Sequence, residues 1–305
     1  MRILLLGSTG MVGRVLKKKL EKKNYKLKSP SRKKLNLLEK KNICDYLKKN
    51  KFDIVINVAG KVGGIMDNMN NQEKYLLENS IINLNLISEC FNSGIKNFIN
   101  LGSSCIYPKN FSRKINESDL FSGPLEPTNE GYAIAKLSAL KLCEYYSKKY
   151  KVNFKTLIPC NLYGPHDNFS EKDGHLIGSV IKKMYFAKLK KQKIVEIWGS
   201  GNARREFMYV EDLANAIIFF IKKISEIPLF LNVGLGKDYK IKKYYKVIAS
   251  SMNYYPKFIY NKSKPEGMKR KLVNTKIQNK FGWRPKFTLE KGIKKTIKYF
   301  INEKK

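Results

Sequence analysis

The chain has 305 residues, and its 43% hydrophobic content is enough for a sizeable buried core. Its longest uncharged apolar run, residues 213–221, is too short for a membrane span and the N-terminus has no signal-peptide pattern, so we expect a cytoplasmic protein with no membrane partner. The net charge is +36, but 53 of the 61 basic residues are lysines spread along the chain, whereas a nucleic-acid groove would gather arginines and aromatic residues, so we expect no nucleic-acid partner.

The first half of the chain alternates short apolar runs with amphipathic segments of helical length. The apolar runs predict strands at residues 2–6, 25–28, 53–59, 98–103 and 154–159. The segments between them predict helices near residues 11–23, 39–50, 73–93 and 128–149. Some of these strands are too continuously apolar for a sheet with one wet face, which favours central parallel strands. We therefore predict an α/β fold with a Rossmann-like doubly wound parallel sheet.

After Pro165 the pattern becomes irregular. It predicts helices at residues 174–193, 210–224, 241–252 and 289–302, and one strand at residues 195–198. Thr288 is placed to cap the last helix. We predict a Rossmann domain over residues 1–164, to which the chain returns around residues 205–235, and a smaller mixed α/β lobe over residues 165–305. The cleft between the two is the expected site.

A glycine-rich loop joins the first strand to the first helix. A GxxGxxG pattern at such a junction lets backbone amides approach a pyrophosphate and points a helix N-terminus at its charge. A plain glycine-rich turn is the alternative. We expect dinucleotide binding by Gly7, Ser8, Thr9, Gly10, Met11, Val12 and Gly13.

The end of the second strand indicates which dinucleotide binds. NAD-binding chains usually carry an acidic residue there, but residues 28–33 contain no carboxylate. Arg32 can pair with the 2'-phosphate of NADP through charge-assisted hydrogen bonds. A solvated arginine is the alternative, and we expect NADP rather than NAD.

Three side chains near the fourth strand suggest redox chemistry on an alcohol or ketone. Tyr132 and Lys136 are four residues apart on one helix face, and an ammonium beside a phenol is expected to lower the tyrosine pKa. Ser103 ends the strand at residues 98–103 and can hydrogen-bond a substrate carbonyl.

The five cysteines form no CxxC pair and there are only two histidines, so we predict no metal site.

These motifs together resemble the extended, sugar-nucleotide-modifying short-chain dehydrogenase/reductases. The strings GSSCIYP, EPTN, YAIAK, NLYGPHDNF and WGSG are similar to those of the GDP-L-fucose synthase family over nearly the whole chain. The resemblance implies an NADPH-dependent oxidoreductase whose substrate is a GDP-linked 4-keto sugar. It implies reduction by Ser103, Tyr132 and Lys136. It also implies 3,5-epimerisation with Cys105 as base and His175 as acid.

The same resemblance implies further contacts and an assembly. Cofactor contacts are expected from Lys136, Asn161, Leu162, Tyr163 and His175. Substrate contacts are expected from Lys183, Trp198, Arg205 and Arg270. A homodimer formed through the helix that carries Tyr132 is also expected.

Other functions stay open at this stage. The loop has Ser8 and Thr9 where the family carries a basic residue, which weakens the NADP prediction. The enzyme could be a C4 reductase only, acting on a different GDP-4-keto hexose or heptose after a separate epimerase, since such sugars differ by few atoms. A non-catalytic NADP-binding protein or a nucleic-acid-binding protein are alternatives of another class.

Overall fold

The computed structural model describes residues 1–171, 173–264 and 268–303. Its first lobe contains a six-stranded sheet in the order β10-β5-β4-β3-β1-β2, in which every neighbouring pair is parallel. The strands are β1 (Arg2–Leu6), β2 (Lys26–Lys28), β3 (Ile54–Asn57), β4 (Asn97–Leu101), β5 (Asn153–Pro159) and β10 (Phe230–Val233). The predicted Rossmann-like parallel sheet is confirmed.

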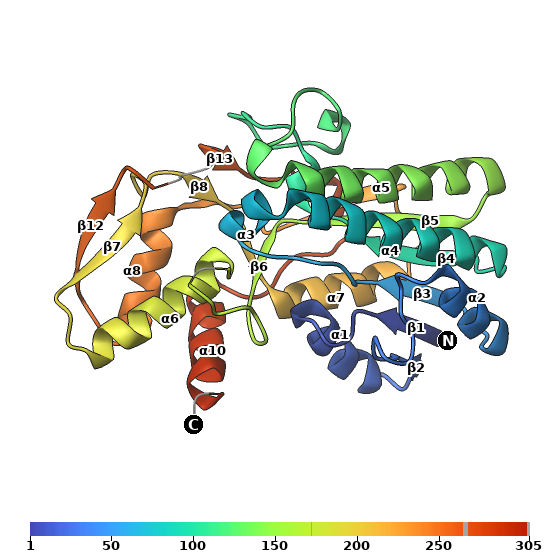
Figure 1. The fold of residues 1–305 in the computed structure, drawn as a ribbon, viewed down its shortest axis with the longest axis horizontal. Coiled ribbons are helices and arrows are strands. Elements are labelled where there is room, and N and C mark those ends of the chain that lie inside the picture. The colour runs from blue at the N-terminus through green and yellow to red at the C-terminus, as the bar shows by residue number, and fades with distance from the viewer. Residues whose placement is uncertain (172, 265–267, 304–305) are drawn as a thin grey trace.

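Helices cover both faces of this sheet because both faces of its strands are apolar. Leu4 and Leu6 of β1 belong to the core under one helix layer, whereas Ile3 and Leu5 belong to the core on the opposite face. One layer consists of α2 (Lys40–Lys49), α4 (Gln72–Asn92) and α5 (Glu130–Tyr150). The other consists of α1 (Met11–Glu21) and α7 (Val210–Ile221), as Figure 1 shows. Such two-sided burial is what parallel sheets require.

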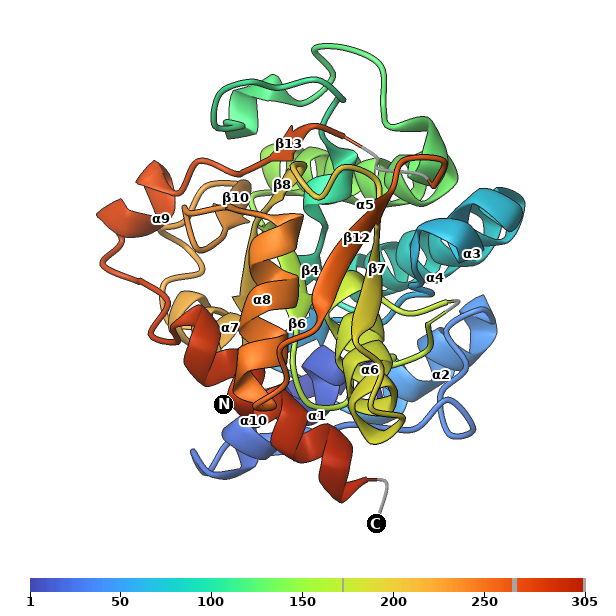
Figure 2. The ribbon, with the colours of Figure 1, turned by 90° about the vertical axis from the view of Figure 1, so that its left-hand side faces the viewer.

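The second lobe has a separate hydrophobic core and faces the viewer in Figure 2. It contains the parallel pair β7 and β12, packed with three helices. Its main elements are α6 (Leu176–Leu189), β7 (Ile194–Trp198), α8 (Ile241–Ser251), β12 (Lys257–Asn261) and α10 (Leu289–Asn302). Between these elements the chain returns to the first lobe, where α7 packs beside α1 and β10 pairs with β5.

Several very short strands connect the second lobe to the first lobe. β6 (Asn161–Tyr163) follows β5 directly and pairs in parallel with β9 (Phe207–Tyr209). β8 (Arg204–Arg205) lies between β11 (Tyr239–Lys240) and β13 (Arg270–Lys271). These pairings are between residues far apart in sequence, and they place side chains of the second lobe opposite the ends of β4 and β5.

The sequence prediction differs from the structure mainly in these short elements. It omits β6, β8 and β9, the edge strand β10 and the strands β11 to β13, and also α3 (Ile65–Asn70) and α9 (Lys276–Lys280), because two to six residues are too few to display a period. The helices expected at 174–193 and 210–224 end earlier, at Leu189 and Ile221. The Thr288 cap is confirmed, since its side chain accepts a hydrogen bond from the Lys291 amide. Within the described residues, no helix has the length and apolar character of a membrane span.

Candidate active site

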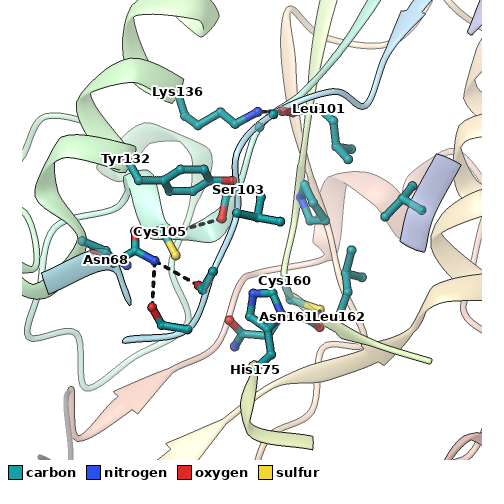
Figure 3. A pocket seen from close by; sticks show the side chains of 18 of the residues that line it. Asn68, Leu101, Ser103, Cys105, Tyr132, Lys136, Cys160, Asn161, Leu162 and His175 are labelled. Atoms are coloured by element: carbon teal, nitrogen blue, oxygen red, sulfur yellow. Dashed lines mark hydrogen bonds between the residues drawn. The ribbon is translucent and has the colours of Figure 1, made fainter. Parts of the chain in front are cut away.

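A cavity of about 380 Å³ lies at the carboxyl ends of β1, β3, β4 and β5, between the two lobes. Ligands of open α/β sheets usually bind at this edge. Figure 3 shows Tyr132, Ser103 and Cys105 on one side of the cavity, with Asn161 and His175 on the other. The sequence-predicted residues of reduction and epimerisation therefore lie around a single space.

The glycine loop forms the floor of the cavity near α1. Gly7 has φ +80°, and a side chain there would collide with the backbone of Ala59, while a Cβ at Gly13 would lie 2.0 Å from the Gly7 oxygen. A Cβ at Gly10 would meet nothing closer than 3.6 Å. Gly10 to Gly13 line the cavity at the N-terminus of α1, so the loop fits the pyrophosphate of a dinucleotide.

Arg32, which was predicted to meet a 2'-phosphate, lies outside the depression next to the glycine loop. Beside the loop is an open depression of about 530 Å³, lined by Ser8, Thr9, Ser29, Ser31 and Arg14 among others. Arg14 donates from Nε to the Thr9 carbonyl at 2.8 Å. Arg32 is exposed and does not line this depression.

The segment after β5 lines the nicotinamide side of the cavity only in part. Asn161 and Leu162 line it, together with Cys160. Tyr163 does not, because its ring is buried in the core of the second lobe and its hydroxyl donates to the Leu289 carbonyl at 3.4 Å. Tyr163 packs into the second-lobe core instead of the cavity, so the structure corrects the prediction that Tyr163 contacts the cofactor.

Lys136 and Tyr132 share a face of α5, as the spacing predicts, but their electrostatics differ from the prediction. Lys136 is buried, donates to the Leu101 carbonyl at 2.9 Å, and burial lowers its pKa to about 8. Burial and the nearby Cys105 raise the pKa of Tyr132, although a hydrogen bond with Ser103 opposes the change. The expectation that Lys136 lowers the tyrosine pKa is therefore wrong for this structure. Tyr132 is protonated at neutral pH and can donate a proton.

Cys105 and His175 face the cavity with charged partners. Cys105 lies in a 3-10 turn after β4, where the Ser103 hydroxyl oxygen accepts a hydrogen bond from its amide. Lys271 Nζ is 3.2 Å from Cys105 Sγ. His175 precedes α6, and its Nδ1 lies 3.3 Å from a buried oxygen of Asp167. Burial opposes charging, but the hydrogen bond and charge of Asp167 raise the pKa of His175.

A second cavity of about 300 Å³ continues from the first into the second lobe. Lys183 and Trp198 line it, and Arg205 lines both cavities. Lys183 donates to the Glu196 carbonyl at 2.8 Å, and burial lowers its pKa. Arg205 donates to the backbone carbonyl of Met268, which fixes the guanidinium between the two spaces. Three of the four predicted substrate contacts therefore surround a common extension of the site.

The fourth, Arg270, lines neither cavity. Its Nε donates to Asp238 at 2.7 Å, and its other nitrogen donates to the Ser112 carbonyl. Successive side chains of a strand point to opposite faces, so it is the next residue, Lys271, that enters the cavity. The structure thus corrects the substrate contact predicted for Arg270.

Sequence reasoning missed several polar groups at the site. Among the described residues, the buried side-chain oxygens without a hydrogen-bond partner belong to Asn68, Asn129 and Asp167. Asn68 and Asn129 line the larger cavity, and Asp167 supports His175. Buried acceptors of this kind usually have a partner, so the oxygens of Asn68 and Asn129, which line the cavity, suit hydroxyl groups of a ligand. No group of three or more potential metal ligands occurs in the described part of the chain.

Comparisons with known proteins match both lobes. The model of the NAD dependent epimerase/dehydratase family matches residues 3–234. GDP-L-colitose synthase of Yersinia pseudotuberculosis is 48% identical over 305 residues, 100% of this chain and 99% of that protein. GDP-L-fucose synthase of Azorhizobium caulinodans is 38% identical over 300 residues, 98% of this chain and 96% of that protein. A solved GDP-mannoheptose C4 reductase from Campylobacter jejuni with NADP bound has a TM-score of 0.89 and 28% identity, and the match covers 98% of each chain.

Proposed function

The chain belongs to the NAD dependent epimerase/dehydratase family, and we propose that it is an NADPH-dependent reductase of a GDP-linked 4-keto sugar that also epimerises its substrate. The family resemblance predicted from the sequence is confirmed. The observation that carries the proposal is one cavity lined by the glycine loop, by Ser103 and Tyr132, and by Cys105 facing His175. A solved relative is described with NADP bound, which supports the same cofactor here.

Reduction uses side chains of the first lobe. NADPH, when bound, supplies the hydride. Ser103 and Tyr132 hold the ketone oxygen of the sugar by hydrogen bonds, and the protonated Tyr132 donates its proton to that oxygen as the carbonyl becomes an alcohol. Lys136 is held by the Leu101 carbonyl and lines the same cavity, where its ammonium is placed to contact the bound cofactor.

Epimerisation uses the pair that faces across the cavity. A ketone acidifies the hydrogens on its neighbouring carbons, so a base on one face and an acid on the other can invert such a centre through an enolate. Cys105 takes the proton, and His175, whose pKa is raised by Asp167, returns one from the opposite face. The enolate oxygen stays on Ser103 and Tyr132, the groups that also serve the reduction.

The nucleotide occupies the second cavity. Arg205, at the junction of the two spaces, pairs with the diphosphate, and Trp198 and Lys183 contact the nucleoside. The related proteins carry GDP in their names, which supports GDP as the carrier.

Reduction without epimerisation is the second candidate. A solved relative is named as a C4 reductase acting on a GDP-mannoheptose, and its fold matches 98% of this chain. The substrate would then be a different GDP-4-keto hexose or heptose, already epimerised elsewhere. The 48% identity with a GDP-L-colitose synthase favours a deoxyhexose instead.

The experiment that separates these candidates uses the purified protein with a panel of GDP-4-keto sugars. With NADPH, NMR of the products gives the configuration at C4 and at the neighbouring carbons. In deuterium oxide without NADPH, deuterium at a carbon next to the ketone indicates epimerase activity. Reduction with no deuterium incorporation supports the second candidate, and failure to reduce any member of the panel contradicts both.

Exposed apolar side chains support the homodimer. Leu77 and Leu84 on α4, and Ile134 and Tyr145 on α5, are each at least 39% exposed. These helices pack together on the outer side of the sheet (Figure 1). We propose that a second copy covers this surface, which light scattering of the purified protein tests directly. The cytoplasmic location and the absence of a nucleic-acid partner stay predictions.

A further inference from the structure

Lys271 enters the active-site cavity from the second lobe. It lies in β13, in register with Arg205 of β8, and its exposed fraction is only 8%. Its ammonium nitrogen is 3.2 Å from the sulfur of Cys105, which follows β4 in the first lobe. A buried amine and a thiol 166 positions apart in the sequence are thus in direct contact across the two lobes.

We propose that Lys271 is a positioning residue that holds Cys105 as a thiolate through an ammonium–thiolate ion pair, so that the base is already charged when the substrate binds. The inference rests on the proposed function only in making Cys105 the base of epimerisation. The pairing itself is a property of the protein without substrate.

The other buried cysteines show what burial does when no cation is present. Burial raises the pKa of Cys143 to about 12, and it raises the pKa values of Cys90 and Cys160 as well. Cys160 lines the same cavity as Cys105. A buried thiol in this chain is therefore neutral unless something nearby stabilises its charge.

Cys105 differs from these thiols in its neighbours. Burial again raises its pKa, but Lys271 from β13, a hydrogen bond with Ser103 and the charge of His175 together hold that pKa below its ordinary value. Within the described residues, Tyr132 from α5 also faces it, and its phenol is neutral because its pKa is raised. Lys271 is the cation in direct contact with the sulfur.

The ion pair has a defined part in the proton transfer. The thiolate takes a proton from the carbon beside the ketone, so that a C–H bond breaks and an S–H bond forms. The electron pair of the C–H bond moves to the ketone oxygen as an enolate. Lys271 neither gains nor loses a proton, and its effect is to keep the acceptor deprotonated at neutral pH.

The test measures the ionisation of Cys105 without substrate. Iodoacetamide reacts with the thiolate, and the tryptic peptide of residues 97–109 contains Cys105 as its single cysteine, so mass spectrometry gives the alkylation rate at each pH. We expect wild-type alkylation of Cys105 to have its midpoint below the ~8.5 of an ordinary thiol. We expect Lys271→Met to raise the midpoint by about one to three pH units, and Lys271→Arg to keep it low.

Matched controls separate the contact from a general loss of charge. Lys269→Met removes the same charge from an exposed neighbour and should leave the Cys105 midpoint unchanged, and Cys44 on α2 is an internal reference in each sample. An unshifted midpoint in a folded Lys271→Met protein contradicts the proposal. If that variant does not fold, a wild-type midpoint at or above the ordinary value overturns it equally.

A second measurement distinguishes this inference from the proposed function. Deuterium incorporation into a GDP-4-keto sugar is measured for the wild type and for Lys271→Met at saturating sugar. We expect the maximal exchange rate of the variant to fall at neutral pH and to recover as the pH rises. A lysine that only binds the diphosphate would instead raise KM without changing the thiol. A shifted thiol midpoint with no exchange in the wild type supports the ion pair and rejects the epimerase.

Discussion

The two sides of the cavity are assembled in different ways and carry different charge. The first-lobe side comes from the end of β4 and the following helix α5, and its proton donor, Tyr132, is a neutral phenol. The second-lobe side is formed by loops and two-residue strands, which place Lys271 and His175 opposite Cys105 of the first lobe. Reduction needs a proton donor that stays protonated, whereas epimerisation needs a base and an acid that are already charged. One space can serve both reactions because the cations of the second-lobe side favour the thiolate of Cys105, while the phenol of Tyr132 beside it stays neutral.

The largest effect is expected from removing the proton donor on the first-lobe side. Tyr132→Phe should lower the rate of ketone reduction by about 10²- to 10⁴-fold, the usual contribution of general acid catalysis. Tyr150→Phe, an exposed tyrosine of the same helix outside the proposed dimer surface, is the matched control and should reduce at the wild-type rate. The rates are followed by NADPH absorbance under single-turnover conditions. If Tyr132→Phe reduces the ketone at the wild-type rate, the proposal that Tyr132 is the proton donor of the reduction is wrong.

The next largest effect concerns Cys105, the charged base of the proposed epimerisation. Cys105→Ala should reduce deuterium incorporation into the substrate by at least about 10²-fold, because no other described base lies in contact with Lys271. The same variant should still reduce a GDP-4-keto sugar supplied in the already epimerised form. NMR of the exchanged sugar and NADPH oxidation measure the two activities separately, with Cys44→Ser as the control. Equal loss of exchange and of reduction would show that Cys105 is needed for both activities.

The sequence predicted the first-lobe side better because that side is built from local spacing. The positions of Ser103, Tyr132 and Lys136 follow from a strand end and a helical repeat of four residues. The effect of Lys136 on Tyr132 did not follow, because it depends on burial and on a hydrogen bond to the Leu101 carbonyl. The glycine loop was likewise predictable, since the close contacts at Gly7 and Gly13 are made within the loop and with the adjacent strand end.

The second-lobe side depends on pairings between distant residues. Whether Arg270 or Lys271 enters the cavity is decided by the register of β13 on β8, and a strand of two residues has no alternation to reveal it. Asp167 gave no signal either, because its role depends on the loop that returns it to His175. Resemblance to a family supplied His175 and Arg205, but not the partners that set their charge and orientation.

A smaller effect is expected from removing the Asp167 carboxylate, which supports His175, the acid of the proposed epimerisation. Asp167→Asn removes the carboxylate that raises the pKa of His175, so the imidazole loses its proton at a lower pH than in the wild type. Deuterium exchange should then decline with rising pH about one unit earlier, and should be roughly tenfold slower above neutral pH. Reduction of an epimerised substrate should keep its pH profile. An unchanged exchange profile would mean that Asp167 does not control His175. Asp173→Asn, in the same loop, is the control.

The smallest effect concerns cofactor binding on the first-lobe side. It tests whether the 2'-phosphate of NADPH is bound by Arg14 or by Arg32, the residue that the sequence suggested. Arg14 lines the depression beside Ser8 and Ser31, whereas Arg32 does not. Because the depression is open to solvent, one arginine there should contribute about 1 kcal/mol or less to binding a phosphate. Arg14→Ala should therefore raise KM for NADPH by about fivefold and leave KM for NADH unchanged, while Arg32→Ala should leave both nearly unchanged. The reverse pattern would show that Arg32 contacts the 2'-phosphate. The segment after β2 would then have to move toward the glycine loop when NADPH binds.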